Sequence, residues 1–123
     1  MSSKLALSIG GVVAVVFGVA LTLLPAAMLG GFGLGAPNEA VILSRDVGVT
    51  LIGLGILNWM ARDATGTALR AILIGNLFVQ VAEFVVNGYE IVSGALPGAA
   101  GGGLVIHVVM AVIFAIPLFR TSA

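Results

Sequence analysis

The sequence predicts an all-α integral membrane protein whose four transmembrane helices form an up-down bundle. Of its 123 residues 60% are hydrophobic and only 8% are charged, whereas a soluble domain carries about 25% charged residues. The apolar residues also fall into four continuous runs, each long enough to approach or exceed the roughly 30 Å hydrocarbon thickness of a bilayer as a helix. A β-barrel would instead show short segments of alternating apolar and polar residues.

We expect one domain with spans at about residues 5–24, 39–60, 70–93 and 104–119. The first span ends at Pro25, and Gly10, Ala14 and Gly18 recur at every fourth position within it. Such a row of small residues lets another helix approach closely, so we expect these three residues at a helix contact. The Pro-Ala-Ala at 25–27 also loosely resembles a signal-peptide cleavage site, which is the alternative interpretation of this run.

The connections differ in character. Residues 26–38 and 94–103 are rich in glycine and are expected to be loops, whereas 61–69 is a short polar turn. The turn is short enough to place the two helices that it joins side by side and antiparallel.

A polar stripe runs along the third span and is the most informative pattern in the chain. It consists of Asn76, Gln80, Glu83, Asn87 and Glu90. At about 100° per residue, these side chains fall within a sector of roughly 80°. A polar stripe facing lipid would be costly, so we expect this one to face protein or a water-filled cavity.

The basic residues predict an orientation. With four spans, Lys4, Arg62, Arg70 and Arg120 all lie on the side of the two termini, and the opposite loops contain no lysine or arginine. Positive residues concentrate on the cytoplasmic side. We therefore expect a multi-pass protein of the bacterial inner membrane with both termini in the cytoplasm.

Six ionisable or polar residues are expected in the outer half of the membrane: Arg45, Asp46, Glu83, Asn87, Glu90 and His107. A rise of about 1.5 Å per residue places Arg45 and Asp46 roughly 9–10 Å below the outer surface, and Glu83 roughly 15 Å below it. We interpret the set as a ligand-binding or ion-pair cluster, because intramembrane ionisable groups are functional candidates by default. Arg45 is expected to couple to Glu83, with Asp46 as the other candidate partner.

Each member of this cluster also has a purely structural interpretation. Arg45 could lock two helices together, Glu83 could be a protonated carboxyl group bonded to Gln80 or Asn87, and His107 could be a polar residue satisfied at a helix contact. Asp46 and Glu90 could simply reach water at the outer surface. The sequence leaves these alternatives open.

Several classes of chemistry have no support in the composition. The chain has no cysteine, which removes disulfides, iron–sulfur clusters and cysteine-bound zinc. His107 is its only histidine, so one chain cannot supply two histidine ligands to a haem. The formal net charge is zero, and nothing suggests nucleic acid as a partner. We identify no catalytic residue, no metal site and no specific cofactor.

The order of these features resembles a known group of proteins. A first apolar helix ends at Pro25, the next begins with NEAVILSRDVGVTLIGLG at 38–55, and the third carries Glu83. This order is similar to that of small four-span bacterial membrane proteins of uncharacterised function and, more loosely, to DoxX-like proteins. The first group implies the four-helix fold but no activity. The second implies an association with quinone-linked sulfur oxidation.

Three functions remain open from the sequence. The first is a bilayer-embedded protein that binds a lipid, a quinone or another apolar ligand, or that serves as an accessory subunit of a larger membrane complex. The second is a homo-oligomeric proton or ion conductor that uses the third-span stripe. The third is a small membrane enzyme, which we favour least because no nucleophile–base pair is visible.

Overall fold

The computed structural model describes residues 1–120 and is helical throughout its main elements. The helices are α1 (Ser3–Leu23), α2 (Pro25–Gly31), α3 (Asn38–Met60), α4 (Gly66–Val92) and α5 (Gly101–Arg120), with short 3₁₀ turns η1 (Ala61–Asp63) and η2 (Gly98–Ala100). No strand occurs in the part of the chain that is described. Four of the helices are long and apolar enough to cross a membrane, so the chain is an all-α, multi-pass membrane protein.

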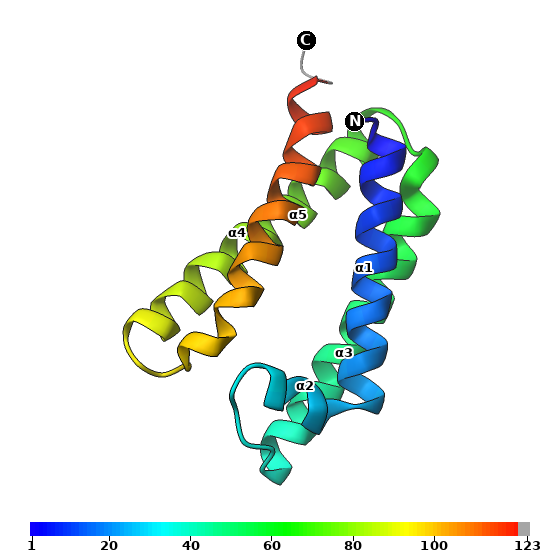
Figure 1. Cartoon of the computed structure of the whole chain (residues 1–123). Helices are drawn as coiled ribbons and strands as arrows, with labels where there is room; N and C mark the ends of the chain where they lie inside the picture. Colours follow the sequence, from blue (N-terminus) through cyan, green and yellow to red (C-terminus); the bar gives the residue numbers. More distant parts are fainter. Residues whose placement is uncertain (121–123) are drawn as a thin grey trace.

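The four long helices form two antiparallel pairs. α1 packs along α3, and α4 packs along α5 (Figure 1). The two pairs approach each other where α1 begins and α5 ends, and they diverge toward the opposite end, so the molecule is V-shaped (Figure 1). The ends of the four helices lie within four residues of the spans expected from the sequence.

The two glycine-rich segments are more helical than the sequence predicts. The segment expected to be a loop after Pro25 begins with α2, because proline at the first helical position carries a fixed φ and lacks only an N–H that needs no intrahelical partner. Likewise α5 begins at Gly101, inside the second glycine-rich segment. Glycine content alone was therefore a poor guide to the ends of these helices.

Glycine lets the backbones of α1 and α3 come very close. A Cβ atom at Gly18 would lie 2.6 Å from the Gly48 carbonyl oxygen, and one at Gly55 would lie 2.7 Å from the Gly11 carbonyl oxygen. These distances are too short for any side chain without a shift of backbone. Small residues on both helices thus fix the spacing of the first pair.

The row Gly10, Ala14 and Gly18 does not face a single helix. Gly18 packs against α3, whereas the ring of Phe114 from α5 covers Gly10. Ala14 lines a cleft between the two pairs. Gly10 and Gly18 are therefore closely packed by other helices, and Ala14 has a different environment.

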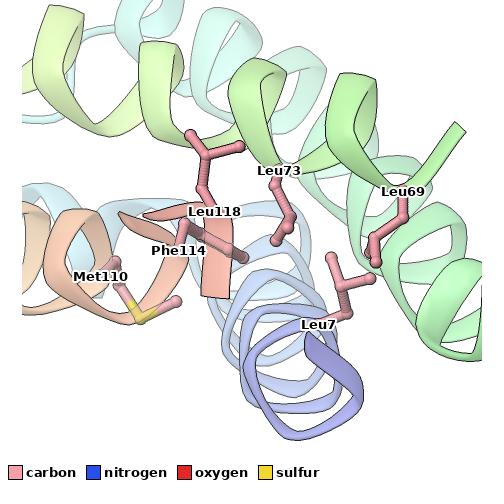
Figure 2. Packing of buried hydrophobic residues seen from close by; sticks show 6 residues of the cluster. All are labelled: Leu7, Leu69, Leu73, Met110, Phe114 and Leu118. Atoms are coloured by element: carbon pink, nitrogen blue, oxygen red, sulfur yellow. The ribbon is translucent and has the colours of Figure 1, made fainter. Parts of the chain in front are cut away.

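A cluster of large apolar side chains joins the two pairs at the narrow end of the V. The cluster consists of Leu7 of α1, Leu69 and Leu73 of α4, and Met110, Phe114 and Leu118 of α5 (Figure 2). Leu7 and Leu73 are completely buried. Burial of such side chains in protein, rather than in lipid, reflects tight packing more than the hydrophobic effect.

Charged residues form contacts on the protein surface at the same narrow end of the V. Lys4 at the start of α1 forms an ion pair of 2.8 Å with Asp63 in η1. Arg62 donates a hydrogen bond to the carbonyl oxygen of Trp59, and its guanidinium carbon lies 4.5 Å from the centre of the indole ring. The chain is thereby fixed where it passes from the first pair to the second.

Replacement of Gly18 by alanine should destabilise the protein, because the new methyl group would collide with the backbone of α3. Overpacking of this kind costs about 1–3 kcal/mol, and we expect a lower melting temperature in detergent. Gly53→Ala is the matched control on α3, since nothing lies within 4 Å of its Cβ position. Equal melting temperatures for Gly18→Ala, Gly53→Ala and the parent chain would contradict this account of the α1–α3 contact.

Candidate functional site: a cleft between the two helix pairs

A cleft of about 190 Å³ lies between the two helix pairs, beside the apolar cluster. Its walls are mostly apolar and include Phe17 of α1, Leu51 of α3, and Ile106 and Met110 of α5. Four polar side chains from three helices also line it: Asn58, Asn76, Gln80 and His107. None of the side chains that line the cleft is acidic, and none is lysine or arginine.

Asn58 and Asn76 bind each other at the narrow end of the cleft. Asn58 Nδ2 donates to Asn76 Oδ1, and Asn76 Nδ2 donates to Asn58 Oδ1, both over 2.8 Å. Asn76 Nδ2 also donates to the Ile72 carbonyl oxygen. The two residues are 1% and 3% exposed, respectively. This reciprocal pair is a polar bridge from α3 to α4, and it uses most of the amide hydrogen-bonding capacity of Asn76.

Gln80 and His107 form the second polar contact, this time between α4 and α5. His107 Nδ1 and Gln80 Oε1 are 2.8 Å apart. Since the amide oxygen can only accept, Nδ1 carries the proton in this arrangement. Both residues are partly exposed, and among residues 1–120 no other hydrogen bond is formed by the remaining ring nitrogen or by the Gln80 amide nitrogen.

The wide end of the V is spanned by the two connecting segments. A Cβ atom at Gly33 would lie 3.3 Å from the side chains of both Pro97 and Ala99, and Phe32 lines the cleft together with Gly103. Gly33 has φ of +76°, a conformation that favours glycine. The connections after α2 and after α4 therefore meet over the end of the cleft that lies away from the termini.

The structure separates the six residues expected to form one cluster. His107 lines the cleft, but Arg45 and Asp46 are exposed on α3 and lie outside the cleft lining. At about 100° per residue, Arg45 is roughly 150° around α3 from the mean direction of Leu51, Leu54 and Asn58, which do line the cleft. Among residues 1–120, Arg45 forms no ion pair with Glu83 or with Asp46. The expected coupling of Arg45 to Glu83 is thus absent from this conformation.

The polar stripe of α4 divides in the same way. Asn76 and Gln80 face the cleft, as the sequence predicts for the stripe, whereas Glu83 is exposed and accepts a hydrogen bond of 3.2 Å from Asn87 on its own helix. Glu90 is half-buried, and its carbonyl oxygen accepts from Leu96 N and Ser93 Oγ. The inward-facing part of the stripe is therefore its half nearest the termini.

Asn58 is the site residue that sequence analysis missed. It lies close to Trp59 at the end of its span, where a polar residue is ordinarily placed at the membrane interface. A signal was available: Gly48, Leu51, Gly55 and Asn58 are spaced 3, 4 and 3 residues apart, which places Asn58 on the glycine face of α3. That spacing marks it as inward-facing.

Comparisons with protein-family models, with curated proteins and with solved structures found no match to this chain. Within residues 1–120, no group of three or more histidine, aspartate or glutamate side chains is placed to hold a metal ion. The function must therefore be argued from the cleft itself.

Replacement of either asparagine of the reciprocal pair by leucine should destabilise the protein, because the other amide would lose its partner. An unsatisfied buried amide costs about 1–3 kcal/mol, whereas hydrogen bonds between membrane helices average about 0.6 kcal/mol. We therefore expect Asn58→Leu and Asn76→Leu each to lower the melting temperature, and the double variant to be less damaged than the sum of the two. Strictly additive effects across this four-member cycle would show that the two amides do not depend on each other.

Proposed function

We propose that this protein binds a small amphipathic molecule of the bilayer, such as a lipid or a ring-bearing lipid-soluble compound, in the cleft between its two helix pairs. The observation that carries the proposal is the lining of the cleft. Apolar walls with a few convergent polar groups are the usual composition of a ligand site. Here those groups are the amide of Gln80 and the imidazole of His107.

The size of the cleft limits what it holds. About 190 Å³ is close to the 150 Å³ of an engineered apolar cavity that accepts benzene, and it is below the 300–1,000 Å³ typical of sites that enclose a drug-sized ligand. A single ring or the head-proximal part of one chain fits this space. The remainder of a longer molecule would extend into lipid, where most of the outer surface of the four helices is apolar.

The same geometry supports binding over conduction by one chain. A proton or ion path along α4 would have to continue from Asn76 toward the end of the molecule that carries the termini. On that side of Asn76 the same face of α4 carries Leu73 and Leu69, which are buried in the apolar cluster. Asn76 itself is held by Asn58. A conductor would therefore require a path formed between several copies. Nucleophilic catalysis by a serine or a carboxylate has no support in the cleft, whose polar side chains are amides and one imidazole.

We propose further that the protein lies in a bacterial inner membrane with both termini in the cytoplasm. Lys4 and Arg62 lie at one end of the molecule, since both contact Asp63. The beginning of α4 with Arg70 and the end of α5 with Arg120 lie there too (Figure 1).

The orientation can be tested with a reporter enzyme fused after Ala123. The reporter activity should be found in the cytoplasm and not in the periplasm. Activity in the periplasm would reverse the assignment and place the wide end of the cleft inside.

A variant that fills the cleft should lose the ligand. Ala14 lines the cleft, whereas Val19 lies on the same helix, is 40% exposed and is outside the lining. We expect Ala14→Phe to abolish copurification of a small molecule seen by native mass spectrometry and solvent extraction, and Val19→Phe to retain it. Melting temperatures establish that both variants fold. Retention of the same molecule at the same occupancy in Ala14→Phe would place its binding site elsewhere.

A further inference from the structure

We infer that the ligand of the cleft is an uncharged amphiphile whose polar group is a hydroxyl that donates to His107, with Gln80 setting the tautomer of the imidazole. The inference rests on the proposed binding function and specifies the chemical class of the ligand. Three observations carry it: the hydrogen-bonding capacity that the Gln80–His107 contact leaves over, the absence of charge in the lining, and the capacity already used by Asn58 and Asn76.

The Gln80–His107 contact presents one donor and one acceptor. Gln80 Oε1 accepts from the Nδ1–H of His107, and a neutral imidazole protonated at Nδ1 has an unprotonated Nε2 that accepts. The Gln80 amide nitrogen carries N–H groups that donate. Among residues 1–120 neither nitrogen has another hydrogen-bond partner, and both residues line the cleft.

A hydroxyl group can bond the ring nitrogen that the Gln80 contact leaves over. It donates its proton to His107 Nε2, while Gln80 Oε1 holds the imidazole in the tautomer whose Nε2 accepts. An ether, ester or quinone carbonyl oxygen can only accept, so it would leave the imidazole nitrogen unpaired in an apolar setting. A site built to hydrogen-bond a hydroxyl discriminates strongly against an analogue that lacks it, because its own polar groups are then left unpaired.

The lining disfavours an anionic headgroup. No lysine, arginine, aspartate or glutamate lies among the residues of the cleft. A phosphate or carboxylate brought between Phe17, Met110 and Phe114 would lose its hydration with no opposite charge to compensate, which is much more costly than desolvating a hydroxyl. Arg45 is the only described cation within the interior of a span, and it lies outside the cleft lining.

The other two polar side chains offer little to a ligand. Asn58 and Asn76 already pair with each other through both amide groups, and Asn76 bonds Ile72 as well. They are almost fully buried, whereas Gln80 and His107 are partly exposed. The polar end of the ligand therefore belongs at Gln80 and His107, and its apolar part along Phe17, Leu51 and Met110.

The test uses the full-length protein in phosphatidylcholine nanodiscs with photoreactive twelve-carbon probes that differ only in the polar group. The probes are the primary alcohol, its methyl ether and the corresponding carboxylate at pH 8. Crosslinked residues are mapped by mass spectrometry. We expect the alcohol to label residues of the cleft with about tenfold higher apparent affinity than the ether, the ratio that corresponds to one or two net hydrogen bonds, and the carboxylate to label it least.

Variants connect this preference to the two side chains. His107→Phe and Gln80→Leu should each reduce labelling by the alcohol to the level of the ether and leave labelling by the ether unchanged. Asn87→Leu is the control, because it removes a polar side chain from the same helix as Gln80 but outside the cleft. Melting temperatures confirm that each variant is folded, and a variant that fails is replaced by His107→Gln or Gln80→Met.

The outcomes separate the two levels of the proposal. If all three probes label the cleft equally, or the ether or carboxylate labels it better than the alcohol, the hydroxyl assignment is wrong while the binding function stands. The assignment is also wrong if the alcohol is preferred but His107→Phe and Gln80→Leu keep that preference. If no probe labels the cleft above the level seen in Ala14→Phe, the binding function itself fails.

Discussion

Two hydrogen bonds between the side-chain amides of Asn58 and Asn76 determine how the two helix pairs meet. Asn58 and Asn76 are buried in protein, where an amide without a partner cannot turn to water, so each asparagine requires the other. The reciprocal geometry also fixes the register, because a shift of either helix by one residue would rotate its amide away by about 100°. On one side of the pair lies the apolar cluster around Leu7 and Phe114, and on the other side lies the cleft. The amide pair thus marks the point at which the helix pairs stop touching.

The cleft follows from where small and large side chains are placed. Glycines bring α1 and α3 together until the Gly18 and Gly48 backbones are in contact. Between the two pairs, large side chains such as Leu73 and Phe114 fill the space near the termini. Farther along, the walls of the space include the small residues Ala14 and Gly103 beside larger ones such as Phe17, and together they do not close it. Small residues therefore allow close contact between α1 and α3, where glycines stand opposite each other, and leave space between the two helix pairs.

The sequence predicts the fold well and the site only in part, for a physical reason. Length and hydropathy locate a helix along the membrane normal, so the four spans and the depths of the polar residues could be derived. Depth does not specify rotation about the helix axis. Arg45 was placed at the level of the polar stripe, but its side chain points to the outside of α3. On α4 the five stripe residues define a face, and Asn76 and Gln80 on that face line the cleft. Asn58 was missed because its closeness to Trp59 suggested an interface position.

The distribution of charge over the molecule bears directly on what the cleft can accommodate. Arg45 is exposed on the outer surface of α3, and Glu83 is exposed on the face of α4 that carries the polar stripe, while the lining of the cleft contains only amides and one imidazole as polar groups. A charge at mid-membrane costs at least about 2.5 kcal/mol on insertion scales. Arg45 lies only seven residues from the start of α3, about 10 Å along the axis, so its long side chain needs to extend only part of the way through the hydrocarbon toward the headgroups. Glu83 is stabilised by the Asn87 amide. The charged groups thus lie outside the lining of the cleft, and the polar groups of the lining itself are neutral. A path for ions would need the reverse arrangement, whereas a site for a neutral amphiphile needs this one, because neutral donors and acceptors recognise a polar headgroup without requiring a counter-charge in lipid.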